Sequence, residues 1–310
     1  MGGQFAAAGG VDMAWTDPIQ YAIPAFIVLI LLEMVWAAKY APTAYDPGDS
    51  LTSLLLGLGR NVVGVLEAGL LLLGGMWLYQ HRVFDLSAIG GDWGWQAWAL
   101  CLLGEDLAYY VWHRSAHRVR WFWASHVNHH SSQHYNLTTA LRQPWTGLIA
   151  LDFIFRIPLV LLGFHPAMVL ACGSISLIYQ FWIHTEAVRR LPRVIEWLVN
   201  TPSNHRVHHA TNPVYLDRNF GGILMVWDHL FGSYQPEIAG EKAHFGIIKQ
   251  LGNFNLIWAA FHEWVEMAGD VWRAPWRSKL GYLWRVPGWS HDGGRETSDE
   301  IRGRWLGNSM

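Results

Sequence analysis

Apolar segments dominate the chain up to residue 182, and only short polar stretches separate them. Five such segments cover residues 21–38, 62–79, 93–112, 148–164 and 166–182. Each comes close to the roughly 20 residues that an α-helix needs to cross about 30 Å of hydrocarbon. The pattern predicts an all-α integral membrane protein with four to five transmembrane helices.

Ionisable residues interrupt several of these segments, namely Glu33, Glu67, Glu105, Asp106, Asp152 and Arg156. A charge at the bilayer centre costs several kcal/mol, roughly, so we expect some spans to be shallow or re-entrant, the second and fourth above all. Asp152 and Arg156 lie four residues apart, a spacing at which a helix brings opposite charges together. We expect these two side chains to neutralise one another.

The distribution of basic residues predicts the orientation in the membrane. Only residues 163–166 separate the last two apolar segments, so these should form a helical hairpin with both outer ends on one side. That side carries Arg114, Arg118, Arg120, Arg142, Arg189, Arg190 and Arg193. The opposite loops hold only Arg82, and the positive-inside rule therefore makes the arginine-rich side cytoplasmic.

Composition supports the membrane class and argues against some partners. Of the 310 residues, 52% are hydrophobic and 15% are charged, which is more apolar than an ordinary soluble chain. A net charge of -2 provides no basic field, so we expect no nucleic-acid partner. Cys101 and Cys172 lie within apolar segments, where buried thiols are more typical than a disulfide or a cluster ligand.

Histidines are concentrated just after the third apolar segment. His113 and His117 occur in HRSAH, at a spacing that places both imidazoles on one face of a helix. The stretch HVNHH contains His126, His129 and His130, and NHRVHH contains His205, His208 and His209. A single such pair is weak evidence, but three groups at i, i+3 or i+4 spacing predict metal ligands.

All eight of these histidines fall on the predicted cytoplasmic side, and His184 lies there at the end of the last span. Nine imidazoles exceed the four ligands of a tetrahedral zinc site and suit two metal ions with open positions. We therefore expect a cytoplasmic helical cap that holds a histidine-rich dinuclear site. Imidazole ligands alone leave the choice between iron and zinc open.

One carboxylate is a candidate to orient an imidazole. Asp106 precedes His113 by two helical turns and shares its face. Other polar residues near the clusters are more typical of caps or surface groups: Asn136, Asn204, Glu186, Asp217 and Asp228. We expect only Asp106 to support a ligand.

After His184 the chain is more polar. Residues 253–267 mix apolar residues with Trp, His and Glu, which is typical of an interfacial amphipathic helix, and residues 292–310 should be flexible. No internal repeat or long linker divides the chain, which predicts a single membrane-embedded domain over residues 1–310. Its expected parts are the N-terminal spans (21–79), the metal-site core (about 104–235) and the C-terminal amphipathic and flexible part (245–310).

The motifs HRSAH, HVNHH and HRVHH behind several apolar spans resemble the fatty acid hydroxylase and sterol desaturase superfamily of membrane di-iron oxygenases. The stretches HHSSQHYNLTTALRQ, YQFWIHTE, TPSNHRVHHATNP and DRNFGGILMVWDHLFGSYQPE look most like its alkylglycerol monooxygenase branch. The family's ligand pattern carries over to His113, His117, His126, His129, His130, His184, His205, His208 and His209. His184 matches through FWIHTE.

The resemblance implies an O2-dependent monooxygenase that oxidises a C–H bond of a membrane lipid at two iron ions. Electrons should come from a separate reductase or a diffusible reductant, because the chain lacks a CxxCH haem site, a cysteine set for an iron–sulfur cluster and a GxGxxG turn. The alkylglycerol branch carries a glutamate after the second histidine, linked with tetrahydrobiopterin, whereas Arg118 occupies that position here. This difference argues against tetrahydrobiopterin and against ether cleavage, and leaves lipid hydroxylation open.

Two alternatives remain open from the residues. A desaturase of the same superfamily would use the same ligand set. A membrane zinc hydrolase is also compatible with the histidines, although it ordinarily pairs a three-ligand site with a carboxylate base.

Overall fold

The computed structural model describes residues 17–309, and their regular secondary structure is helical. Within that range no strand forms, and only the isolated bridges Val199–Leu224 and Ala210–Phe245 occur. The α-helices are α1 (Pro18–Tyr40), α2 (Pro47–Tyr79), α3 (Trp95–Arg118), α4 (Arg120–His130), α5 (Gly147–Ala150), α6 (Ile157–Leu161), α7 (Pro166–Phe181), α8 (Arg193–Leu198), α9 (Pro202–His208), α10 (Val226–Leu230), α11 (Leu256–Arg273), α12 (Gly281–Trp284) and α13 (Ser298–Ser309). The 3-10 segments are η1 (Leu86–Ala88), η2 (Thr139–Leu141), η3 (Asp152–Arg156) and η4 (Trp276–Ser278). The predicted all-α character is confirmed.

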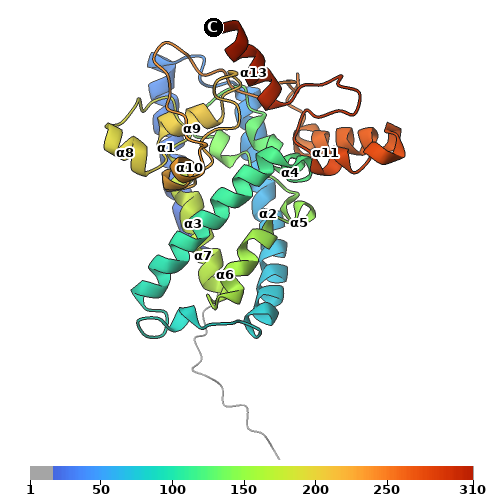
Figure 1. The fold of residues 1–310 in the computed structure, drawn as a ribbon. Helices are drawn as coiled ribbons and strands as arrows, with labels where there is room; N and C mark the ends of the chain where they lie inside the picture. The colour runs from blue at the N-terminus through green and yellow to red at the C-terminus, as the bar shows by residue number, and fades with distance from the viewer. Residues whose placement is uncertain (1–16, 310) are drawn as a thin grey trace, which may run out of the picture.

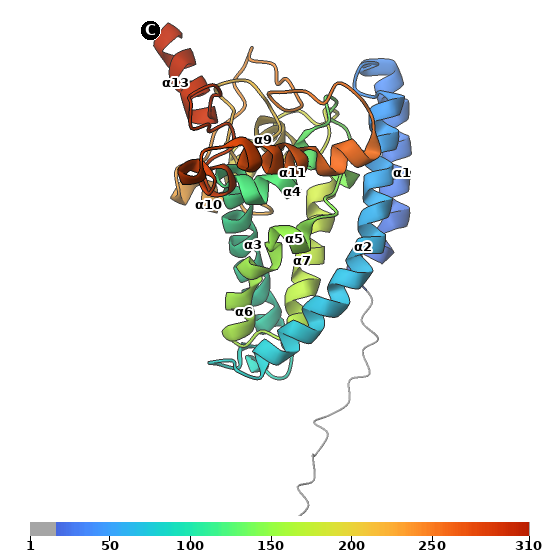
Figure 2. The ribbon, with the colours of Figure 1, turned by 90° about the vertical axis from the view of Figure 1, so that its right-hand side faces the viewer.

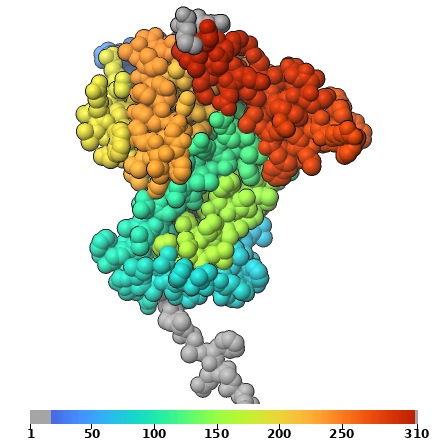
Figure 3. Space-filling model, viewed as in Figure 1, coloured from blue at the N-terminus to red at the C-terminus, as the bar shows by residue number. Residues whose placement is uncertain are grey.

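Helices α1, α2, α3 and α7 run lengthwise and, with the short α6, form a stalk (Figures 1 and 2). Helix α7 packs against both α1 and α3, and α6 packs against α2. Helices α4 and α8–α13 gather at one end and form a head, and the short α5 lies between α4 and α6. In the space-filling view the yellow to red residues of this head are broader than the stalk below them (Figure 3).

Helices α1 and α2 have the length and apolarity needed to cross a membrane. Each begins at a proline that follows an aspartate N-cap, Asp17 or Asp46. Only 17% and 11% of their most apolar windows are buried, so these helices are not the core of a soluble bundle. Helix α2 starts at Pro47, whereas the predicted segment starts at residue 62. The first turns of α2 contain polar residues, so a search for apolar runs does not detect them.

The third predicted span lies in α3, which continues to Arg118, and the fifth corresponds to α7, which has 16 residues. The segment 148–164 is not the continuous helix that the pattern predicts. It divides into α5, η3 and α6, with Leu151 between the first two in a left-handed conformation (φ 62°). The predicted turn between α6 and α7 is present at Gly163, whose φ of 100° and tight approach to the Phe84 carbonyl exclude a side chain.

The predicted pairing of Asp152 with Arg156 is wrong. Both residues lie in η3, where three residues per turn place positions i and i+4 on different sides. The Arg156 guanidinium instead contacts Glu105 of α3 at 2.6 Å, and Glu105 is completely buried. The charge of Glu105 is thus neutralised by a side chain that is distant in sequence.

The C-terminal part is more ordered than the sequence indicates. Helix α11 contains the predicted amphipathic stretch: Ile257, Val265 and Trp272 are exposed, whereas Ala259 and Met267 are buried. It crosses the direction of the stalk where the stalk meets the head (Figure 2). Within the predicted flexible tail, Ser298–Ser309 form helix α13.

Candidate metal centre

The nine predicted histidines come from four parts of the chain. His113 and His117 end α3, His126, His129 and His130 lie on α4, His184 follows α7, and the last three lie at α9. Val119 between α3 and α4 has an extended backbone (φ -128°, ψ 120°), which turns α4 away from the axis of α3. As a result the imidazoles of His113 and His126 meet, with ring centroids 4.7 Å apart.

The structure divides these histidines into two buried groups. The five-histidine group contains His113, His117, His126, His130 and His208, and the four-histidine group contains His129, His184, His205 and His209. Within each group the ligand atoms lie within 4.8 Å of one another, close to twice the metal–nitrogen distance of about 2.1 Å. No side chain of the nine is more than 6% exposed. Two ions, one in each group, would account for this arrangement.

Backbone carbonyls orient four of the imidazoles. Nδ1–H of His113 donates to the Phe220 carbonyl at 2.8 Å, and Nδ1–H of His208 donates to the Arg218 carbonyl at 2.9 Å. In the other group, His129 donates to the carbonyl of Arg142 and His184 to that of Gln180. Since a carbonyl can only accept, the proton lies on Nδ1 and the Nε2 lone pair is free to bind a metal.

His129 and His184 provide a test of whether a metal fits. Their Nε2 atoms lie 3.3 Å apart, and both rings carry their proton on Nδ1. Two lone pairs therefore face one another without a proton between them, an arrangement that is repulsive unless a cation lies between. In the five-histidine group Nε2 of His117 is also buried without a hydrogen-bond partner. The donor set, the facing lone pairs of His129 and His184 and the unsatisfied Nε2 of His117 fit metal ions.

The electrostatics of the site favour neutral, metal-binding imidazoles. Burial, with smaller contributions from neighbouring histidines, lowers the pKa well below its ordinary value for His126, His129, His130, His205, His208 and His209. Burial also lowers the pKa of His184 to about 4. At neutral pH these rings are uncharged, which is the form that coordinates metals.

Asp106 does not contact an imidazole, contrary to the sequence prediction. Its carboxylate accepts hydrogen bonds from the backbone N–H groups of Ile223 and Leu224 and from Nε1 of Trp227. The carboxylate that touches a ligand is Asp217, whose Oδ1 lies 3.2 Å from Nδ1 of His117. The sequence indicates only a cap or surface role for Asp217, because this residue lies 100 residues from His117.

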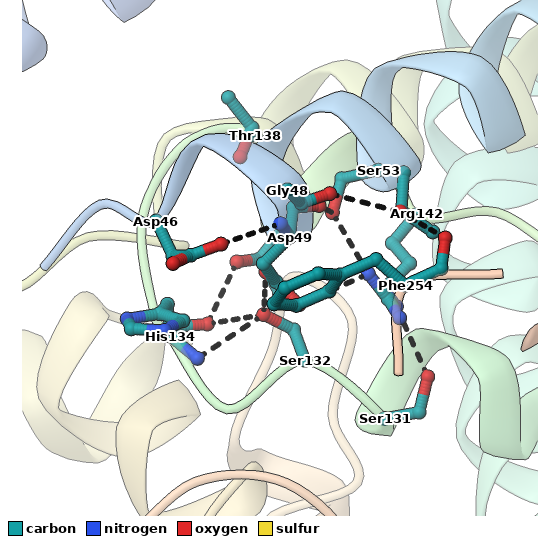
Figure 4. A network of polar contacts seen from close by, with 12 residues as sticks. Asp46, Gly48, Asp49, Ser53, Ser131, Ser132, His134, Thr138, Arg142 and Phe254 are labelled. Atoms are coloured by element: carbon teal, nitrogen blue, oxygen red, sulfur yellow. Dashed lines mark hydrogen bonds and ion pairs between the residues drawn. The ribbon is translucent and has the colours of Figure 1, made fainter. Parts of the chain in front are cut away.

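A polar network that contains Arg142 and Asp49 lies near the start of α2 (Figure 4). The guanidinium of Arg142 donates to the Asn128 carbonyl, to Ser131 and to Ser53, and pairs with Asp49 near the start of α2. The backbone carbonyl of the same arginine accepts the proton of His129. The sequence indicates only an orientation role for Arg142, because the partners of its side chain lie on separate elements.

Residues 98–233 match the family model described as Fatty acid hydroxylase. The chain is 37% identical over 275 residues to an alkylglycerol monooxygenase of Danio rerio and 37% identical over 281 residues to one of Homo sapiens. Both alignments cover 88% of this chain and 60% of the relative. An ornithine lipid hydroxylase of Rhizobium tropici is 27% identical over 148 residues, which cover 48% of this chain and 44% of that protein.

The alignments with alkylglycerol monooxygenases include most of this chain. The chain nevertheless spans only about 60% of the length of those relatives. No solved structure matches it. The resemblance inferred from the histidine motifs is confirmed.

Proposed function

We propose that the chain is a member of the fatty acid hydroxylase superfamily and acts as a membrane-bound, O2-dependent lipid hydroxylase whose nine histidines hold two iron ions. The observation that carries this proposal is the pair of all-histidine groups buried where the stalk meets the head. Hydroxylases of lipids are among its relatives, and its apolar helices would bring a lipid to that site.

The donor set favours iron over zinc. Structural zinc is satisfied by four ligands and catalytic zinc by three with one open position, whereas one group here offers five imidazoles. Neither group contains a carboxylate among its described candidate ligands, although a zinc hydrolase ordinarily needs a carboxylate base. Two bound iron ions would supply the reduction of O2 that oxidation of an unactivated C–H bond requires.

The protein's own groups would exclude water and hold the ligands. All nine imidazoles are buried, and the carbonyls of Phe220, Arg218, Arg142 and Gln180 keep the Nε2 lone pairs directed inward. A buried site of this kind protects a reactive centre from solvent. The chain's residues provide no haem, flavin or iron–sulfur motif, so a separate donor would deliver the electrons.

We place α1, α2, α3 and α7 in the membrane as four spans, with the broken segment of α5, η3 and α6 as a fifth, re-entrant element. The arginines predicted to be cytoplasmic lie at the ends of these elements nearer the head, and by the positive-inside rule this supports a cytoplasmic metal centre. The amphipathic α11 would then lie along the membrane surface.

The relatives indicate the chemical class of the substrate, a lipid, and not its identity. Alkylglycerol monooxygenase and ornithine lipid hydroxylase both name lipids, and hydroxylation of a lipid is the reaction that they share. Arg118 is paired with Asp299 at 2.6 Å, so the position that carries glutamate in the alkylglycerol branch is basic and engaged in an ion pair here. This supports a reductant other than tetrahydrobiopterin. Desaturation by the same ligand set is the alternative.

Lipid mass spectrometry after expression under 18O2 tests the proposal. Cells that produce the protein should contain a lipid heavier by one 18O atom, and cells that produce the His130→Ala variant should not. A lipid lighter by two hydrogens would identify a desaturase, and lipid turnover that persists without O2 would exclude an oxygenase.

A further inference from the structure

One short loop serves three ligands of the same metal group. We name residues 217–220 the acceptor loop, because Asp217 accepts from His117, the Arg218 carbonyl accepts from His208 and the Phe220 carbonyl accepts from His113. All three histidines belong to the five-histidine group. The four-histidine group has different acceptors, the carbonyls of Arg142 and Gln180. The two groups are therefore oriented by separate parts of the chain.

The acceptor loop has an uncommon backbone that needs support. Asp217 and Asn219 both have positive φ angles, 52° and 57°, which are costly for residues other than glycine and least so for Asp and Asn. The Asn219 side chain donates to the carbonyls of Asn204 and Gln235 and accepts from the Gln235 N–H. These bonds anchor the end of the loop near Phe220.

The C-terminal helix α13 anchors the other end. The Arg302 guanidinium donates to the carbonyl of Leu216, directly before the loop. Asp299 pairs with Arg118 at 2.6 Å, and Arg118 also lies 3.9 Å from Asp217. Helix α13 thus contacts both the residue that follows His117 and the residue that precedes Asp217.

We infer that α13, acting through Arg302, Asp299 and the acceptor loop, positions the ligands of the five-histidine group and not those of the four-histidine group. Asp217 and Arg302 are positioning residues in this scheme, since each acts through a ligand or a loop and not on the metal itself. Hydrogen-bond partners of ligands typically change metal affinity by about 10- to 100-fold. The inference rests on the proposed metal centre, and it predicts that the two ions can be released independently.

Iron retention by the full-length chain in detergent tests this inference. Wild-type protein and variants are loaded anaerobically with ferrous iron, dialysed against increasing chelator and assayed for bound iron per chain. Arg302→Ala should release one of two irons at about tenfold lower chelator concentration, and Asp217→Asn at about 10- to 100-fold lower. Arg302→Lys, which can still donate to the Leu216 carbonyl, should restore part of the retention.

Arg304→Ala is the matched control, because Arg304 lies on the same helix, its ion-pair partner among residues 17–309 is Glu296, and both of these side chains are largely exposed. Two backgrounds assign the released iron. His205→Ala removes the iron of the four-histidine group, and Arg302→Ala should then make the remaining iron easier to chelate. His130→Ala removes the iron of the five-histidine group, and Arg302→Ala should then leave the chelator concentration for the remaining iron unchanged.

The outcomes separate the inference from the function on which it rests. A wild-type chain that binds fewer than two irons refutes the proposed dinuclear centre. If the wild-type chain binds two irons but Arg302→Ala behaves like Arg304→Ala, the role of α13 is refuted and the dinuclear centre stands. The same holds if Arg302→Ala weakens the retention of both irons equally.

Discussion

The guanidinium of Arg142 lies 3.3 Å from the carboxylate of Asp49, and both side chains are almost completely shielded from solvent. This ion pair joins the start of α2 to the residue whose carbonyl orients His129. The first segment after α1 is therefore coupled to the four-histidine group, although that group contains no residue from the N-terminal helices.

Asp49→Ala should lower the free energy of unfolding by about 3 kcal/mol, because it leaves the Arg142 charge buried without its partner. Thermal unfolding of the purified protein in detergent measures this loss. The double variant with Arg142→Met, which keeps the backbone carbonyl, should recover part of the stability. If Asp49→Ala and the wild type unfolded at the same temperature, the pair would not stabilise the fold.

Removing one ligand from each group should remove one metal ion at a time. His129→Ala and His208→Ala should each reduce bound iron from two to about one and lower lipid oxidation by at least about 100-fold, since even a ligand's hydrogen-bond partner is worth about 10- to 100-fold. Elemental analysis and lipid mass spectrometry measure the two effects. His244→Ala is the control, because this exposed histidine belongs to neither group. Unchanged metal content in both ligand variants would argue against the two groups as metal sites.

The metal-free protein should lose stability in mild acid. Burial lowers the pKa of His184 to about 4 in the folded state, against about 6.5 in the unfolded chain. Below pH 6.5 the unfolded state binds more protons, so stability is complete above that pH and falls as pH decreases toward 4. This histidine alone contributes on the order of 3 kcal/mol.

Thermal unfolding of the metal-free protein between pH 7.5 and 5 checks this prediction. His184→Leu should reduce the pH dependence in part, because the other buried imidazoles still titrate, whereas His244→Leu, at an exposed position, should leave it unchanged. A midpoint that does not change with pH in the wild type would show that these imidazoles are not held neutral by burial.

The exposed apolar face of α11 should contact lipid. Trp272 is 84% exposed on this face, and a spin label at Trp272→Cys should collide more often with O2 than with a water-soluble nickel chelate. The two native cysteines are buried, which favours specific labelling. Lys249→Cys, at an exposed position beside the same helix, should show the opposite preference. Equal accessibility at both positions would place α11 in water.

The sequence by itself determined what depends on neighbours in the chain. Apolar runs of near-membrane length predicted helices, and histidines at i, i+3 and i+4 predicted shared helix faces, because both patterns follow from 3.6 residues per turn. The same local logic predicted the turn at Gly163, where the backbone needs a glycine. The family-specific stretches are also short segments of contiguous sequence around the histidines, and they were sufficient to indicate the superfamily.

Only the tertiary structure decided which imidazoles belong together and what holds them. Adjacent residues on α4, His129 and His130, enter different groups because successive side chains point about 100° apart and face different partners. Asp217 reaches His117 across 100 residues, while Asp106, nearer in sequence, holds a backbone loop. Such contacts arise where separate helices pack against one another, and the periodicity of a single helix carries no information about its partner.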